Sequence, residues 1–289
     1  MLSSSVRPVA RTLCGFLGLL PTAHAHPASG IVVDGYGNIF FIDSRHALYR
    51  LDPKHATTIV KAVTDGHWLA IDQIGRFANA SPRYFERVTP PGAIPALIYA
   101  GGGAPITVAS DGALYYGSGE SNGDPMFPGG LELSKIQPDG TQLKVSDDLK
   151  RILASWDDGI TALAAGPGES VYVGTWTGLV KVNLGGPAAV MKHPLTVPEC
   201  DVDFADHKPG NKLPYIRGLA VLPDGTVFAA ATSCHAVVRI SRSGTVKTVL
   251  KAERPWSPTG LALHGQDLYV LEYTNANGPG TEGWRPRSD

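Results

Sequence analysis

Short runs of apolar residues alternate with Gly- and Asp-containing turns along the whole chain, and the same unit recurs at a spacing of about 40 residues. The clearest copies are residues 30–43 and 218–231, each an apolar run, a turn and a second apolar run. Gly, Asn and Asp tolerate the positive φ of tight hairpin turns, so each copy predicts a β-hairpin. The six copies begin near Gly30, His67, Pro105, Gly159, Gly218 and Gly260.

Two further strand-like runs follow most of these hairpins. They are clearest after the first, third and fifth copies, at residues 48–52 and 57–60, 133–137 and 143–145, and 237–241 and 246–250. The pattern predicts an all-β fold, a six-bladed β-propeller with four-stranded antiparallel blades. The second copy, from Trp68 to Tyr99 with Gly75 as its turn, is the most degraded. One or two helical turns are predicted over residues 148–154.

The last copy is incomplete. It has strand-like runs at residues 261–263 and 268–272, then a loop to Trp284, and the sequence stops at Asp289. Two outer strands need roughly 15 to 20 more residues. We therefore expect a thin sixth blade with an exposed edge that favours self-association. The alternative is a natural chain that continues beyond Asp289.

The fifth copy, Gly218-Leu-Ala-Val-Leu-Pro-Asp-Gly-Thr-Val-Phe228 followed by Val237-Val-Arg-Ile-Ser241, resembles the NHL-repeat and SMP-30/gluconolactonase-like group of six-bladed propellers. The resemblance covers nearly all of the chain after residue 25. It implies the architecture. It does not select a chemistry, because such propellers host lactonases, lyases, synthases and binding modules.

Residues 1–25 have the composition of a secretory signal peptide. Arg7 and Arg11 form a positive region, Leu13 to Leu20 an apolar core, and Ala23-His24-Ala25 an A-x-A cleavage site. The alternative is a short buried hydrophobic element. The prediction is one propeller domain over residues 26–289 of a secreted or periplasmic protein, with no other run long enough to span a membrane.

Two cysteines remain after residue 25, Cys200 and Cys234. Cys200 precedes the fifth blade, and Cys234 follows that blade's second strand. In a propeller, blade-to-blade connections and loops between second and third strands emerge on one face. Export permits oxidation, so a Cys200–Cys234 disulfide is predicted. The alternative is two buried or free thiols.

Charge gives no indication of a nucleic-acid partner. The chain has 25 Lys and Arg against 26 Asp and Glu, and the predicted leader carries two of the arginines. No basic stripe is present, so we expect no nucleic-acid binding. Charged residues are few, and Gly and Pro are abundant, which fits a turn-rich β protein.

A functional site in a propeller is expected where top-face loops converge on the central channel. The candidates there are grouped by chemistry. For acid–base or anion chemistry they are His67, His235 and Arg217. For contacts to a ligand they are His46, Trp156, Trp176, Tyr215 and Tyr273. For a divalent metal (Ca, Mg or Zn) they are Asn122, Asp124, Asp158 and Glu272. The alternatives are surface positions for His46 and His235, and an inter-blade ion pair for Arg217.

The resemblance implies a specific metal site, which the sequence does not reproduce. SMP-30-like lactonases hold a divalent metal with a Glu at the start of the first inner strand, two Asn and an Asp. This chain has Ser29-Gly30 at the first position, and its fourth blade has Asp158 and Thr175 where an Asn is expected. Asn122 and Asp124 match only loosely.

Two hypotheses follow. The preferred one is an exported module whose top face binds a small molecule, a glycan or a protein. The alternative is a metal-assisted hydrolase or lyase of SMP-30-like type at the channel mouth, favoured by the number of ionisable groups that converge there.

Overall fold

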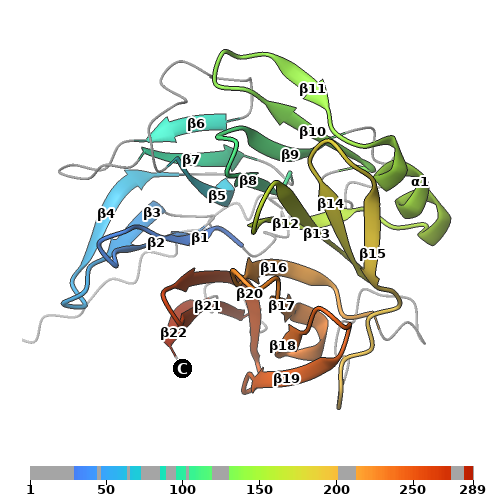
Figure 1. Cartoon of the computed structure of the whole chain (residues 1–289). Coiled ribbons are helices and arrows are strands. Elements are labelled where there is room, and N and C mark those ends of the chain that lie inside the picture. The colour runs from blue at the N-terminus through green and yellow to red at the C-terminus, as the bar shows by residue number, and fades with distance from the viewer. Residues whose placement is uncertain are drawn as a thin grey trace, which may run out of the picture.

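The computed structural model describes residues 29–43, 47–63, 66–72, 85–88, 96–101, 104–118, 130–200, 213–274 and 283–288. These residues form six antiparallel sheets arranged around a common centre, with one α-helix at the periphery (Figure 1). The predicted all-β propeller is confirmed. Four sheets have four strands and two have three.

The four-stranded blades are meanders. Blade one is β1 (Ile31–Val33), β2 (Ile39–Asp43), β3 (Ala47–Leu51) and β4 (Thr57–Ala62). Blade three is β8 (Ile106–Val108), β9 (Leu114–Ser118), β10 (Glu132–Ile136) and β11 (Gln142–Lys144). Blade four is β12 (Ile160–Gly166), β13 (Ser170–Thr175), β14 (Leu179–Asn183) and β15 (Ala188–Lys192). Blade five is β16 (Ile216–Val221), β17 (Val227–Ala231), β18 (Ala236–Ile240) and β19 (Val246–Lys251).

The two three-stranded blades differ from their predictions. Blade two contains β5 (Gly66–Asp72), β6 (Phe85–Val88) and β7 (Ala96–Gly101) in the spatial order β5-β7-β6. The partner of β5 is therefore β7, not a strand directly after Gly75, which lies outside the described residues. Blade six contains β20 (Trp256–His264), β21 (Asp267–Thr274) and β22 (Gly283–Ser288). It has one more strand than predicted, because residues 283–288 pair with β21.

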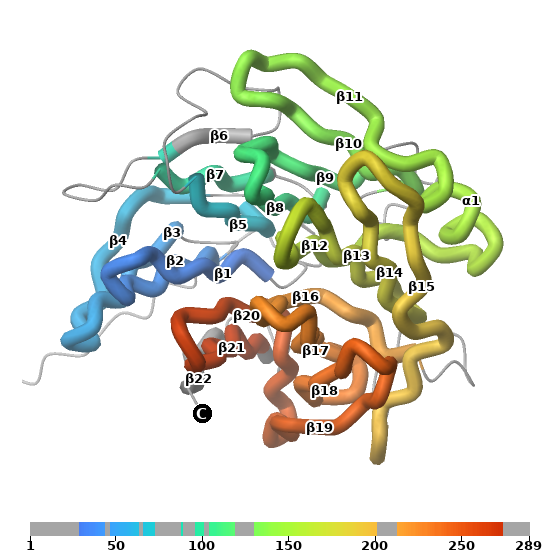
Figure 2. The backbone as a smooth tube through the Cα atoms, in the orientation of Figure 1, coloured from blue at the N-terminus to red at the C-terminus, as the bar shows by residue number. Residues whose placement is uncertain are grey.

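The innermost strands close the ring. β1, β5, β8, β12, β16 and β20 each contact the next, and β20 contacts β1 (Figure 2). The contacts between neighbouring blades are apolar. The largest buried cluster draws residues from blades two to five, among them Trp68, Leu114, Tyr172 and Ile216. Burial between blades removes both faces of most strands from water, which explains their near-continuous apolar runs.

A cross-strand pair of an aromatic residue and a cation recurs in the blades. Tyr115 on β9 lies opposite Lys135 on β10, and Tyr172 on β13 lies opposite Lys181 on β14. Each ammonium lies over the ring, at 5.8 and 5.9 Å from its centroid. Phe40 and Arg50 in blade one, and Phe228 and Arg239 in blade five, have the same register. The cation covers the ring with its aliphatic stem and keeps its charge near water.

Helix α1 (Asp147–Trp156) connects blades three and four and is longer than the predicted one or two turns. The Ser146 hydroxyl accepts from the Leu149 amide at its start, and Asp157 ends it in a left-handed conformation at φ 53°. Leu149 and Leu153 are fully buried. Within the described ranges, no helix combines the length and hydropathy that a bilayer crossing requires.

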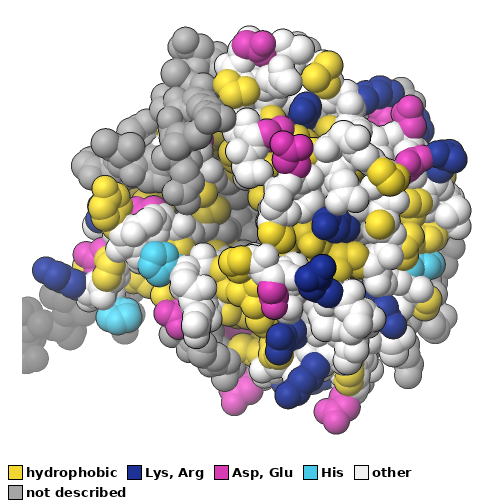
Figure 3. Space-filling view, viewed as in Figure 1, with side chains coloured by type: hydrophobic (Ala, Val, Ile, Leu, Met, Phe, Trp, Pro, Cys, Tyr) yellow, Lys and Arg dark blue, Asp and Glu magenta, His cyan; other side chains and the backbone are white. Residues whose placement is uncertain are grey.

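Side chains of both charges are mixed on the face seen in Figure 3. Lys and Arg side chains gather mainly over blades four and five, with acidic side chains between them (Figure 3). Arg239 and Arg242, for example, lie near Asp224 and contribute to the lowering of its pKa, after its hydrogen bonds to Thr226.

Candidate functional site

A β-bulge recurs near the start of four inner strands. The register shifts between Gly66 and Trp68, Ile160 and Ala162, Ile216 and Gly218, and Pro258 and Gly260. The extra residues are His67, Thr161, Arg217 and Thr259. Bulges re-aim side chains and are frequent beside functional sites. Ser29, before Gly30, and Ala104, before Pro105, are the equivalent positions of the other two blades. We call these six residues the mouth ring.

Hydrogen bonds join members of the mouth ring across blade boundaries. The Ser29 amide donates to the His67 carbonyl at 2.9 Å, joining blades one and two. The Thr161 hydroxyl donates to the Ile216 carbonyl at 2.6 Å, beside Arg217, joining blades four and five.

Glycines after the bulges allow two further close approaches. A Cβ on Gly218 would lie 3.0 Å from the Thr259 carbonyl oxygen, and one on Gly260 would lie 2.5 Å from the Ser29 carbonyl oxygen. Real Cβ atoms do not approach backbone oxygen at 2.5 Å. The absence of a side chain at these positions therefore brings blades five, six and one together at the ring.

The mouth ring is polar and carries no carboxylate. Its six side chains are one guanidinium, one imidazole, three hydroxyls and one methyl group. Arg217 is 4 % exposed, and the Ser29 hydroxyl is buried without a hydrogen-bond partner among the described residues. A guanidinium with neighbouring hydroxyls is suited to bind an anion, and a carboxylate fits its fork of donors. It is not a set of ligands that holds a hard cation.

An aromatic pair lies beside Arg217. Trp176, in the loop between β13 and β14, stacks on Tyr215, which precedes β16, with ring centroids 3.8 Å apart and planes inclined by 6°. The Arg217 guanidinium carbon lies 5.5 Å from the Tyr215 centroid. The structure thus brings together three residues predicted separately from sequence. Tyr215 has φ 45°, a conformation that costs energy in a residue other than glycine.

A second stacked pair also lies close to this loop. Trp156, the last residue of α1, stacks on exposed His193 at a centroid distance of 3.8 Å and an angle of 3°. Both rings lie close to Gly178, where a Cβ would be 3.1 Å from Trp156 and 3.2 Å from His193. Trp156 is therefore in contact with the blade-four loop, but its stacking partner is His193 and not the Tyr215 pair.

His235 is buried, so its alternative as a surface histidine is wrong. It is 8 % exposed, and its Nδ1 lies 2.7 Å from the Trp256 carbonyl oxygen and 2.9 Å from the Ser257 hydroxyl. A carbonyl only accepts hydrogen bonds, which assigns the proton of a neutral ring to Nδ1 and leaves Nε2 as an acceptor. Nε2 has no hydrogen-bond partner in the part of the chain that the structure describes.

Asp158 is buried and its carboxylate accepts four hydrogen bonds. Oδ1 accepts from the amides of Gly159 at 2.8 Å and Trp176 at 3.0 Å. Oδ2 accepts from the amide of Thr177 at 2.9 Å and from its hydroxyl at 2.5 Å. Asp158 thus fixes the loop that carries Trp176, and its role as a metal ligand stays a prediction.

The remaining predicted residues are divided between described and undescribed segments. Glu272 on β21 is fully buried, and it is paired in register with Pro258, next to Thr259 of the mouth ring. Tyr273 follows it and is half-buried. His46, Asn122 and Asp124 lie outside the described residues. Among the described residues, no three His, Cys, Asp or Glu side chains lie close enough to hold a metal ion.

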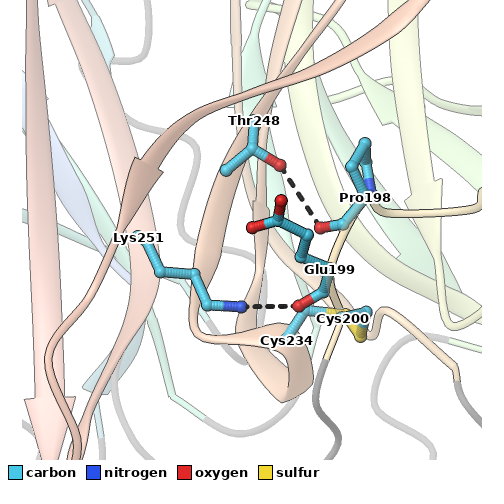
Figure 4. The surroundings of a disulfide bond; sticks show 6 residues. All are labelled: Pro198, Glu199, Cys200, Cys234, Thr248 and Lys251. Atoms are coloured by element: carbon cyan, nitrogen blue, oxygen red, sulfur yellow. Dashed lines mark hydrogen bonds between the residues drawn. A yellow bond between two sulfur atoms is a disulfide. The ribbon is translucent and has the colours of Figure 1, made fainter.

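The predicted disulfide is confirmed. Cys200 and Cys234 are bonded, with their Cα atoms 4.7 Å apart (Figure 4). Sequence reasoning missed Ser29, Thr161 and His193. The first two could have been found by aligning the inner strands on the small residue after the bulge, as in Thr161-Ala162-Leu163 and Thr259-Gly260-Leu261.

An open groove lies at the opposite end of the blades from the mouth ring. Its volume is about 540 Å³, and it is bordered by the turns of blades three and four, including Asp111, Asp139 and Glu169. Its one cation, Lys135, already lies 3.5 Å from Asp111. This groove is not the candidate site, because it lies away from the top-face loops that converge on the channel.

Comparison with known proteins supports the fold. No family model matches the sequence, and no curated protein matches it. Among solved structures, the chain is similar to a luciferin-regenerating enzyme (14% identity, TM-score 0.57, 91% of each chain covered). It is similar to regucalcin, a calcium-binding protein of Agrobacterium tumefaciens (14% identity, TM-score 0.55, 88% of this chain and 84% of that one). It is also similar to virginiamycin B lyase of Staphylococcus aureus (14% identity, TM-score 0.50, 90% and 84%). At such identities the likeness shows a shared propeller fold.

Proposed function

We propose that the protein is an exported propeller that binds a small organic anion at its mouth ring, with Arg217 pairing with a carboxylate of the ligand. The observation that carries the proposal is the composition of the ring. A buried guanidinium and three hydroxyls occupy equivalent positions, and none of the six residues is acidic. A guanidinium with hydroxyls at equivalent positions of the ring is suited to an anionic ligand.

The aromatic pair gives the site a second element. Tyr215 and Trp176 stack beside the guanidinium, so we expect a ligand that reaches Arg217 to lie next to these rings. Binding sites of this kind combine an apolar wall with a few placed polar groups. The ligand class is therefore a small carboxylate with a ring, such as a sugar acid or an aromatic acid.

Calorimetry and thermal melts with paired ligands test this proposal. We expect sugar acids or aromatic acids to bind, and the neutral amide of each acid to bind at least tenfold more weakly. Arg217→Met should lose at least tenfold in affinity, since a charged hydrogen bond contributes about 1.5–3 kcal/mol. Arg217→Lys retains the charge but not the fork, so it should recover only part of the affinity.

Arg239→Met is the matched control, because Arg239 is exposed on blade five. It should leave the affinity unchanged. Equal affinity for an acid and its amide, or full affinity in a folded Arg217→Met variant, would show that the ring does not recognise the carboxylate.

A metal-assisted hydrolase or lyase is the second candidate. It is favoured by Glu272, a fully buried carboxylate in register with the residue before Thr259, and by His67 in the ring itself. Carboxylates and imidazoles at one channel mouth are the groups that acid–base chemistry uses. Elemental analysis should then find stoichiometric Ca, Mg or Zn, and EDTA should lower the melting temperature. A metal-free protein that is insensitive to EDTA and inactive on lactones would eliminate this candidate.

The compartment and the wider set of partners belong to the same proposal. The disulfide is compatible with a secreted or periplasmic protein, as the sequence of residues 1–25 predicts. A glycan or a protein remains an alternative ligand of the top face. Blade six has β22 as its edge strand, and self-association through this edge stays a prediction.

A further inference from the structure

The segment of residues 193–200, here called the strap, crosses from blade four to blade five. At one end, the Leu195 amide donates to the Thr177 carbonyl at 2.7 Å, in the blade-four loop that carries Trp176. At the other end, the Lys251 ammonium donates to the Glu199 carbonyl at 2.8 Å, on the outermost strand of blade five (Figure 4). Leu195 and Val197 are buried in the main core cluster, so the strap is packed between the two blades.

The disulfide joins the strap to a single helical turn beside the aromatic pair. Cys234 ends the 3₁₀ turn η1 (Thr232–Cys234), and all three of its residues are buried. The amides of η1 hold the segment that leads into β16. The Thr232 amide donates to the Tyr215 carbonyl at 3.1 Å, and the Ser233 amide donates to the Pro214 carbonyl at 3.3 Å. The disulfide is thus one short turn away from the backbone of Tyr215.

Tyr215 depends on this support because its conformation is unfavourable. Its left-handed backbone is held by the two bonds from η1 and by its own amide, which donates to the Trp176 carbonyl at 3.1 Å. A 3₁₀ turn of three residues has weak internal hydrogen bonding. In contrast, β16, β17 and β18 of blade five are held together by their own ladders of backbone pairing.

We propose that the Cys200–Cys234 disulfide is a redox latch on the ligand site. When it is formed, η1 holds Tyr215 against Trp176 and beside Arg217. When it is reduced, η1 and the strap separate, Tyr215 relaxes from its left-handed conformation, and the aromatic wall of the site is lost. This regulation rests on the proposed anion site, and it would complete that site only in an oxidising compartment.

The chemical step is a thiol–disulfide exchange. A dithiol attacks one sulfur as the thiolate, and its second thiol then releases the mixed disulfide. The protein gains two electrons and two protons and becomes two thiols, while the dithiol becomes a disulfide. Cys234 is fully buried and Cys200 half-buried, so attack at Cys200 is the accessible route.

Fluorine NMR of the full chain labelled with 5-fluorotryptophan tests the latch without any ligand. The chain has five tryptophans, and Trp176→Phe assigns the resonance of Trp176. A ring stacked at 3.8 Å shifts that resonance, so dithiothreitol should move it towards the random-coil position. Trp68 on β5, in blade two, is the control and should not move. Trp256, whose carbonyl contacts His235 beside Cys234, is not used as a control.

The double variant Cys200→Ser/Cys234→Ser should reproduce the reduced spectrum and lose at least tenfold in affinity for the acid selected by calorimetry. If the variant loses thermal stability but the Trp176 resonance does not move, the latch is overturned and the disulfide only stabilises the fold. Collapse of all five resonances would also overturn it, because the effect would then be global unfolding. If Trp176 moves but the oxidised protein binds no acid, the conformational switch is confirmed and the proposed ligand is wrong.

Discussion

Asp158→Ala is the substitution that separates a structural carboxylate from a metal ligand at this site. Its side chain is 3 % exposed and accepts four hydrogen bonds. Removal leaves the buried amides of Gly159 and Trp176 without their acceptor. The Thr177 amide also lies 3.2 Å from the Thr175 hydroxyl, which can still accept from it. Each buried donor left without an acceptor costs about 1–3 kcal/mol, so the two amides predict a loss of about 2–6 kcal/mol of unfolding free energy.

Urea denaturation followed by tryptophan fluorescence measures this loss as a shift of the midpoint. Asp224→Ala is the matched control. Asp224 is exposed in the turn between β16 and β17, and its one described backbone bond is from the Thr226 amide at 2.8 Å. Its removal should lower the unfolding free energy much less than Asp158→Ala does, because water can replace an exposed acceptor. The reasoning is refuted if Asp158→Ala costs no more than the control. It is also refuted if EDTA destabilises the wild type as much as the substitution does, since Asp158 would then act through a metal.

Two further predictions concern the packing of the ring and the titration of a buried phenol. Gly260→Ala places a methyl group 2.5 Å from the Ser29 carbonyl oxygen and should cost about 2–3 kcal/mol in urea denaturation, whereas Gly35→Ala, which meets nothing within 4 Å, should stay within about 0.5 kcal/mol. Burial, and then the hydrogen bond to Asp111, raise the pKa of Tyr115 far above its ordinary 10.0. The unfolded phenol ionises near that value while the folded one stays neutral, so stability should fall as the pH rises through and above 10, and Tyr115→Phe should flatten the fall. An equal slope in the variant would assign the fall to other groups.

Local pattern predicted the blades because each hairpin is specified by neighbouring residues. In five blades the two innermost strands are joined by a short turn, so apolar periodicity and turn chemistry suffice. Blade two has no such turn. Its two inner strands are separated by residues 73–95, and no rule for short-range turns predicts that β7 inserts between β5 and β6.

The chemistry of the site was harder to predict from the sequence, because the hydrogen-bond partners of its residues come from distant parts of the chain. Asp158 is a residue type that often binds metals. Its role as a hydrogen-bond acceptor depends on Trp176 and Thr177, which follow it by 18 and 19 residues. The tautomer and burial of His235 depend on Trp256, 21 residues later. The disulfide was predictable because it depends only on which loops share a face, and propeller topology fixes that.

The strand order of blade two has a consequence for the order of folding. Pairing β5 with β7 closes a loop over residues 73–95, whereas β16 and β17 close over residues 222–226. The longer loop adds about 1.4 kcal/mol of closure entropy to the barrier for pairing. We therefore expect blade two to assemble after the hairpins of the other blades. Since β5 links β1 to β8, circularisation of the whole ring must wait for it, and the late step closes the gap between blades one and three.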